Sequence, residues 1–187
     1  MAPYSTVTTE LERELGMGEQ LLWSNQPKRG LRLRAADAFF IPFSLLWAGF
    51  AVFWESSVVR SGAPFFFMLW GIPFLCAGAY LTVGRFFVDA ALRAKTWYGV
   101  TNERILIVGG LFNRTVKSLP LRSLPEIALE QRQDGSGTIT FGSSMPFASW
   151  YRGVAWPGMD QRMAPTFELI PDAKAVYEII RHAQRTA

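Results

Sequence analysis

Residues that carry chemistry in most enzymes are sparse in this chain of 187 residues. His182 and Cys76 are its only histidine and cysteine. A serine nucleophile needs a neighbouring base, and a Cys/His zinc site needs several ligands, so neither chemistry is expected. The carboxylates of the second half show no spacing typical of an acid–base pair: Glu126, Glu130, Asp160 and Glu168. We therefore expect no catalytic residues, no metal site and no cofactor.

The segment Asp134-Gly135-Ser136-Gly137 has the glycines of a phosphate-binding loop. No Gly-Lys-Ser/Thr follows it, and the next segment reads as a strand, so the helix N-terminus that would bind a phosphate is missing. Glycine also permits the positive φ angles of tight turns. We predict a turn between two strands here.

The composition excludes several classes of protein. Half of the residues are hydrophobic and 18% are charged, against about 25% charged residues in an average soluble domain. A disordered chain needs low hydrophobicity and high charge, and a single cysteine cannot staple a small scaffold. The net charge is +4, but bases and acids nearly balance after residue 95, so nucleic acid is not an expected partner.

Two uncharged stretches, 38–54 and 61–84, hold the excess of apolar residues. Roughly 20 apolar residues cross a bilayer as a helix, and a helix buried in a soluble protein usually keeps a polar stripe that both stretches lack. The first stretch also begins too late for a signal peptide. We predict a transmembrane hairpin over 36–84, with helices at about 37–57 and 63–84. Two buried helices of a soluble protein are the alternative.

Basic residues flank the hairpin on one side. Seven lie before or after it: Lys28, Arg29, Arg32, Arg34, Arg85, Arg93 and Lys95. Only Arg60 lies in the connection, so the positive-inside rule places both termini in the cytoplasm. The N-terminal segment 1–35 and a basic juxtamembrane linker, 85–95, would then be cytoplasmic. The seven bases either determine this topology alone or also bind anionic lipid head groups.

Within the hairpin, small residues would let the two helices approach closely. They are Ser44, Ala48 and Ala51 on the first helix and Gly71, Gly78 and Thr82 on the second. The acids Asp37 and Glu55 are placed at helix ends, so they do not indicate a proton path.

From residue 96 onward the pattern changes to short β-like segments followed by a helix. The expected strands are 97–100, 104–108, 115–121, 126–132, 138–141 and 166–170. After Asp172, apolar residues recur at helical spacing on one face: Val176, Ile179, Ile180 and Ala183. An antiparallel sheet is the available partner for that face, so we expect an α+β domain.

Two motifs carry a family resemblance. Gly18-Glu19-Gln20-Leu21-Leu22-Trp23 precedes the hairpin, and Tyr98-Gly99-Val100-Thr101-Asn102-Glu103-Arg104 follows it. In this order the chain resembles the bacterial pleckstrin-homology (PH)-like integral membrane proteins, whose β-domain begins with a Y-x-V-T-x-x-R signature. The resemblance implies a PH-like β-barrel or sandwich over 96–187, closed by the C-terminal helix, in a multi-pass protein of the bacterial cytoplasmic membrane. We expect Arg104 to be a structural cation that pairs with Glu103 or Glu130. A contact with a ligand such as a phosphate is the alternative.

The long segment 143–165 has few strand signals but many aromatic residues. Trp and Tyr favour protein hot spots and membrane interfaces. We predict a docking tip formed by Trp150, Tyr151, Arg152 and Trp156. The alternative is a loop that folds its aromatic residues onto its own domain.

The function expected from these features is a non-enzymatic interaction or assembly module, anchored in the bilayer and binding a partner protein at the cytoplasmic face. The partner is a membrane protein or a second copy of the chain. Two alternatives remain open: a sensor of anionic lipid, and an accessory subunit of a membrane enzyme or transporter.

Overall fold

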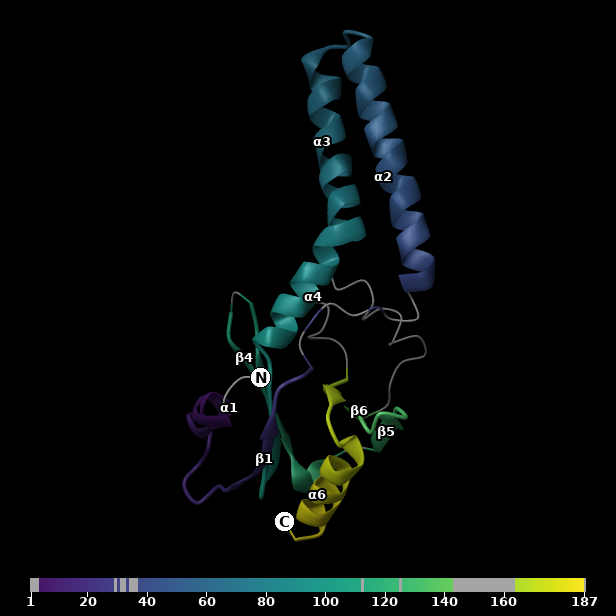
Figure 1. Cartoon of the computed structure of the whole chain (residues 1–187). Coiled ribbons are helices and arrows are strands. Elements are labelled where there is room, and N and C mark those ends of the chain that lie inside the picture. Colours follow the sequence, from purple (N-terminus) through teal and green to yellow (C-terminus); the bar gives the residue numbers. More distant parts are fainter. Residues whose placement is uncertain are drawn as a thin grey trace. The chain divides into compact units, whose positions relative to one another are not determined.

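The structure, a computed structural model, describes residues 4–28, 30, 33, 37–111, 113–124, 126–142 and 164–186 (Figure 1). The chain divides into two compact units. We call the described residues from Asp37 to Asp89 the hairpin. The β-domain contains the described residues up to Gly30 and from Ala90 onward.

The hairpin consists of two long helices joined by a tight turn (Figure 1). The first is α2 (Asp37–Arg60), and the second begins with α3 (Phe65–Ala79). It continues through a π-helical turn, η1 (Tyr80–Gly84), into α4 (Arg85–Ala94). Helices of 24 and 30 residues with this composition are long and apolar enough to cross a membrane.

Both helices extend beyond their predicted ends. Helix α2 ends at Arg60 instead of residue 57. The first residue after position 57 with a conformation that ends a helix is Gly62, whose φ is +64°. The segment 85–95, which the sequence analysis treats as a linker, forms α4 up to Ala94, since it lacks Gly and Pro and is rich in alanine. Glu55 consequently lies five residues inside α2, and its prediction as a helix end is wrong.

The small residues predicted to line the hairpin contact do meet there. A Cβ added at Gly78 would lie 3.1 Å from the Cα atom of Ala48. The hydroxyl of Thr82 donates to the carbonyl oxygen of Gly78 at 2.8 Å and to that of Ser44 at 3.4 Å. Ser44, Ala51, Gly71 and Gly78 are buried. The backbones of the two helices therefore approach closely. Close packing at small residues is typical of helix pairs in membranes, where the hydrophobic effect does not drive helices together.

The β-domain contains two antiparallel sheets. The first has the order β1-β2-β3-β4: β1 (Leu21–Asn25), β2 (Trp97–Thr101), β3 (Arg104–Gly109) and β4 (Thr115–Pro120). A single turn of 3-10 helix, η2 (Leu121–Ser123), follows β4. The second sheet has the order β5-β6-β7: β5 (Ile127–Gln131), β6 (Gly137–Phe141) and β7 (Thr166–Ile170).

Helix α6 (Ala173–Thr186) and both sheets share one core. Val176, Ile180 and Ala183 of α6 are buried, which confirms the predicted apolar face. Strands of both sheets pack against this face through Val100, Ile105, Ile139, Phe141 and Phe167. The helix therefore closes the core between the sheets.

The N-terminal segment is part of the same domain. Strand β1 pairs with β2, with Asn25 opposite Tyr98. Helix α1 (Tyr4–Glu12) packs Val7 and Leu11 onto Leu106 and Val108, in a second apolar cluster. Residues 1–35 and 96–187, which the sequence analysis describes as separate segments, are thus joined by strand pairing. The hairpin is an insertion between two neighbouring strands of one sheet.

The α+β class with two apolar helices and antiparallel sheets is confirmed. Among the described residues the strands form two separate sheets. The structure therefore supports two packed sheets capped by a helix and does not show a closed barrel.

Candidate functional site

The two sequence motifs meet in one hydrogen-bond network in the β-domain. Glu19 lies in the first motif, and its side chain is only 1% exposed. Arg104 of the second motif donates through Nε to Glu19 Oε1 at 2.9 Å and through Nη2 to Oε2 at 2.8 Å. The hydroxyl of Thr101 donates to Glu19 Oε1 at 2.7 Å, and the backbone N–H of Gly16 donates to Oε2, also at 2.7 Å. This two-pronged arrangement is the strong geometry for an arginine–carboxylate pair.

Neighbouring contacts make the network a junction between chain segments. Arg104 Nη2 also donates to the carbonyl oxygen of Glu14 at 2.7 Å. The backbone N–H of Gln20 donates to Asn102 Oδ1 at 2.8 Å, and the N–H of Asn102 donates to the carbonyl oxygen of Gln20 at 3.1 Å. Arg104 is thus a structural cation, as expected, but its partner is Glu19 and not Glu103 or Glu130.

The two hydrogen bonds between Arg104 and Glu19 favour the charged form of both groups. Hydrogen bonds from Arg104 lower the pKa of the Glu19 carboxyl to about 2. The same bonds raise the pKa of the Arg104 guanidinium above its ordinary value. General acid–base catalysis works best with a pKa near the operating pH. The network therefore holds the domain together and has no group poised for proton transfer.

A second ion pair closes the base of the hairpin. Arg85 at the start of α4 lies 2.9 Å from Asp37 at the start of α2, and their side chains are 3% and 5% exposed. The guanidinium of Arg85 also lies over the rings of Phe86 and Phe40, at 4.6 and 5.6 Å from their centroids. These contacts join the two helix segments at the end opposite the turn.

The predicted lipid-facing bases do not all lie on the surface. Arg85 is buried in the ion pair, and Arg93 is 4% exposed and donates to the carbonyl oxygen of Gly30 at 2.8 Å. Lys95 donates to the carbonyl oxygen of Leu111 at 3.5 Å and is exposed. The remaining members, Arg29, Arg32 and Arg34, lie outside the described residues. Arg85 and Arg93 therefore have structural contacts, which the sequence pattern did not indicate.

Lys28 binds the predicted turn between β5 and β6. Its Nζ lies 3.1 Å from Asp134 Oδ2, while Asp134 Oδ1 accepts hydrogen bonds from the backbone N–H and the hydroxyl of Ser136. The hydroxyl of Ser136, followed by Lys28, lowers the pKa of Asp134 to about 2. Gly135 has a φ of +75°. The glycine-rich segment is thus a strand-joining turn, as predicted.

The predicted docking tip, Trp150, Tyr151, Arg152 and Trp156, lies outside the described residues. Within the part of the chain that the structure describes, no group of three His, Cys, Asp or Glu side chains could hold a metal ion. His182 is exposed on α6, and Cys76 is exposed on α3.

A four-stranded and a three-stranded antiparallel sheet with one C-terminal helix across their shared core define a PH-like domain, here with a helical hairpin inserted after its first strand. The family model described as Bacterial PH domain matches residues 39–184. The match covers most of the chain and includes the hairpin from Phe39 onward, so the chain belongs to the bacterial PH domain family. No curated protein and no solved structure matches the chain significantly.

Proposed function

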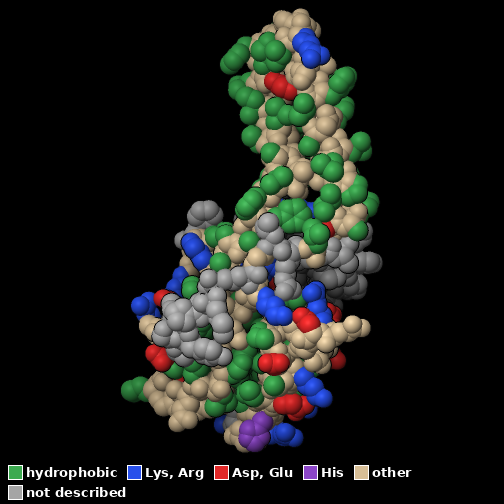
Figure 2. All heavy atoms as spheres, in the orientation of Figure 1, with side chains coloured by type: hydrophobic (Ala, Val, Ile, Leu, Met, Phe, Trp, Pro, Cys, Tyr) green, Lys and Arg blue, Asp and Glu red, His purple; other side chains and the backbone are tan. Residues whose placement is uncertain are grey.

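We propose that this protein is a membrane-anchored PH domain that binds a partner protein at the cytoplasmic face of a bacterial membrane and is not an enzyme. The observation that carries the proposal is the exposed apolar surface of the hairpin. In the most apolar part of each helix, only 17% and 11% of the residues are buried inside the molecule. Figure 2 shows hydrophobic side chains along the visible face of the hairpin.

The size of this apolar surface argues for lipid. Leu46, Phe53 and Phe65 are each at least 70% exposed. Monomeric soluble proteins rarely expose contiguous apolar patches larger than a few hundred square ångströms. Exposure of such side chains to water costs about 1.5–3 kcal/mol each, a cost that the hydrocarbon core of a bilayer removes.

The insertion point supports an anchoring role. The hairpin leaves the β-domain after β1 and returns before β2, which are hydrogen-bonded neighbours. Both ends of the insertion therefore lie beside one another, and an antiparallel pair of membrane helices has the same property. A domain tethered in this way meets other membrane proteins at a raised effective concentration.

Several contacts support an interaction module over an enzyme. The two carboxyl groups whose pKa values are lowered to about 2, Glu19 and Asp134, owe the shift to structural partners. Bacterial PH domain membership points in the same direction, because a fold of this kind offers sheet edges and loops for binding.

Cysteine labelling tests the membrane topology. In a Cys76→Ser background, Ser61→Cys in the turn of the hairpin should react with a membrane-impermeant maleimide on intact spheroplasts, because the positive-inside rule places this turn outside. Ala175→Cys, which is exposed on α6, should react only after permeabilisation. Recovery of the protein in the alkaline-extracted supernatant, or equal labelling of both sites before permeabilisation, would reject the anchor.

Partner binding is tested at the predicted docking tip. Trp150→Ala with Trp156→Ala should lower recovery of a cross-linked membrane partner by more than about tenfold, since buried aromatic residues carry most of the binding energy of an interface. Lys174→Ala on the exposed face of α6 is the matched control. Unchanged recovery with both tryptophans replaced would assign partner binding to another surface.

A further inference from the structure

Glu55 carries a buried carboxylate oxygen, Oε2, for which the described residues of the hairpin supply no hydrogen-bond donor. Serine and threonine hydroxyls of the hairpin differ, because they donate to carbonyl oxygens of their own helix. These bonds run from Ser44 to Ile41, Ser56 to Val52, Ser57 to Phe53 and Thr82 to Gly78.

The position of Glu55 makes this lack of a partner costly. It lies five residues before the end of α2, about 7.5 Å along the helix axis. Acids within a membrane helix are costly, increasingly so toward the bilayer centre, and such residues normally pair or face a wet cavity. The carboxylate instead lies against Gly71 of α3, where an added Cβ would overlap it.

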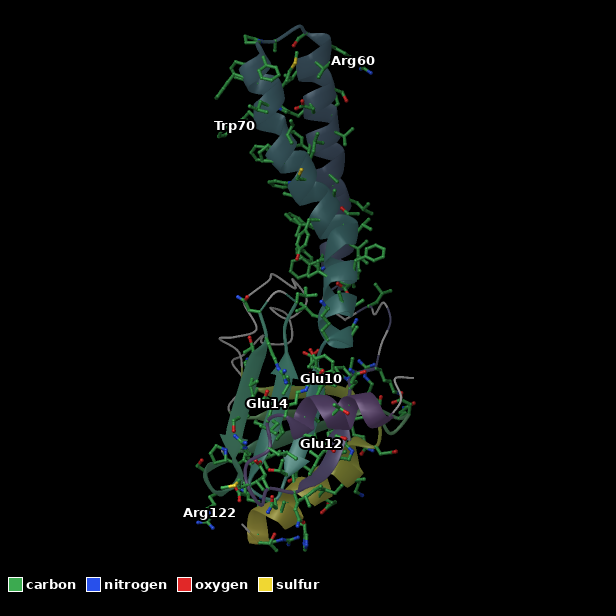
Figure 3. All side chains as sticks on the ribbon, turned by 90° about the vertical axis from the view of Figure 1, so that its left-hand side faces the viewer. Glu10, Glu12, Glu14, Arg60, Trp70 and Arg122 are labelled. Atoms are coloured by element: carbon green, nitrogen blue, oxygen red, sulfur yellow. The ribbon has the colours of Figure 1, made fainter. Side chains whose placement is uncertain are left out.

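The other charged residue at this end of the hairpin is Arg60. It is exposed, and no described residue forms an ion pair with it. Figure 2 shows an acidic and a basic side chain among the hydrophobic ones near the turn, and Figure 3 labels Arg60 at that end. Residues five apart on a helix point about 140° away from each other, whereas pairs three or four apart are neighbours, so Glu55 and Arg60 do not face each other within one chain.

Residues five apart on a helix can instead pair with residues of a second, parallel helix. In two parallel helices, the positions that flank the contact seam and pair between chains are five residues apart along the sequence. With Glu55 and Arg60 as flanks, the seam consists of Gly49, Val52, Ser56 and Val59. Val52 and Val59 are 55% and 53% exposed. A Cβ at Gly49 would meet nothing within 4 Å.

This seam is separate from the contact with α3. Ser44 and Ala51 on α2 are buried, and Ala48 packs against Gly78. Ala51 and Glu55 face α3, and the seam residues Val52 and Ser56 each follow one of them. A step of one residue turns a side chain by about 100° around the helix. Small residues let membrane helices approach closely, and the seam alternates the small residues Gly49 and Ser56 with the exposed Val52 and Val59.

We propose that α2 is the interface of a parallel two-fold dimer, in which Glu55 of each chain pairs with Arg60 of a second copy. Two reciprocal ion pairs flank the seam, because a two-fold axis repeats each contact. The long arginine side chain covers the axial offset between the two residues. This inference rests on the proposed membrane anchor and adds the partner: another copy of this chain.

Disulfide trapping in liposomes tests the seam. In full-length protein with Cys76→Ser, Val59→Cys should form a disulfide-linked dimer at least about tenfold faster than Ser57→Cys, because a seam position meets its own copy across a two-fold axis. Ser57 is exposed and lies at the same depth but on the outer side of α2, so it is a matched control. Equal rates for both cysteines, or a chain that stays monomeric at high protein density, would overturn the dimer.

Charge replacement tests the pairing. Glu55→Gln or Arg60→Gln should lower Val59→Cys trapping about tenfold, the change that corresponds to losing about 1.4 kcal/mol of interhelical contact. The double variant Glu55→Gln with Arg60→Gln should trap no more slowly than either single variant, because all three variants remove the same contact. No effect of the single variants, or an additive loss in the double variant, would refute the pairing. Labelling of Ser61→Cys from outside reports insertion in each variant, so a failed anchor is distinguished from a failed dimer.

Discussion

Arg104→Ala is expected to remove a large part of the stability of the β-domain. The substitution leaves the buried Glu19 carboxylate without its cation and removes the bond to the Glu14 carbonyl. Breaking a buried ion pair by deleting one partner costs about 3–5 kcal/mol. A domain of this size is stable by only about 5–15 kcal/mol in total. Urea unfolding of the full-length protein in detergent, followed by near-UV circular dichroism, measures the loss.

Two further variants separate charge from packing. Glu19→Gln keeps the shape of the side chain and should cost less than Arg104→Ala, about 1.5–3 kcal/mol for hydrogen bonds to a charged group. Glu12→Gln is the matched control, because Glu12 is exposed on α1 near Glu10 and Glu14 (Figure 3). An Arg104→Ala protein with the unfolding midpoint of the Glu12→Gln control would contradict a structural role for the network.

The same pair predicts how stability depends on pH. The pKa of Glu19 is about 2 in the folded protein, below its ordinary value of 4.5. A carboxyl whose pKa is lowered by folding stabilises the native state above its unfolded pKa, and this contribution is lost as the pH falls. The contribution is about 3 kcal/mol and should disappear between about pH 4.5 and pH 2. Glu19→Gln should flatten this part of the acid-unfolding curve.

Arg85→Ala is expected to open the base of the hairpin. Asp37 would remain buried at the start of α2 without the arginine that lies 2.9 Å away. The expected cost is again about 3–5 kcal/mol, since the remaining carboxylate is desolvated. A disulfide between positions 48 and 78 measures the change. A Cβ at Gly78 would lie 3.2 Å from that of Ala48, close to the distance that a disulfide spans. Ala48→Cys with Gly78→Cys, in the Cys76→Ser background, should cross-link several-fold more slowly when Arg85 is replaced.

The control for this prediction removes both charges. Replacing a buried ion pair by neutral groups of similar size is often neutral for stability. Asp37→Asn with Arg85→Met should therefore cross-link at nearly the rate of the protein that keeps both charges. If the double variant were as impaired as Arg85→Ala, the effect would come from lost packing over Phe40 and Phe86.

Much of the architecture was readable from local patterns. The two apolar stretches predicted the hairpin, and the small residues on each predicted the contact between Ala48 and Gly78. The spacing of Val176, Ile180 and Ala183 predicted the buried face of α6. Asp134 and Gly135 predicted the turn between β5 and β6. Each of these features depends on residues within a few turns or strands of one another, so periodicity and turn chemistry are sufficient to predict them.

The pairing of distant charges was not readable in this way. Glu19 and Arg104 are 85 residues apart, and the sequence offered the nearby Glu103 as a partner for the arginine. Arg85 and Arg93 read as members of a basic cluster, because composition does not tell an interior cation from a surface one. The interior position of Glu55 depended on where α2 ends, and helix ends are the least predictable feature of a helix.

The sequence by itself determined that this chain forms a helical hairpin and an α+β domain of the bacterial PH domain family. Only the tertiary structure decided that the N-terminal segment completes the first sheet, that the hairpin is inserted between β1 and β2, and which charges are paired. The reason is that hydrophobic periodicity is a local property of the chain, whereas strand order and ion pairing depend on which distant segments the shared core brings together.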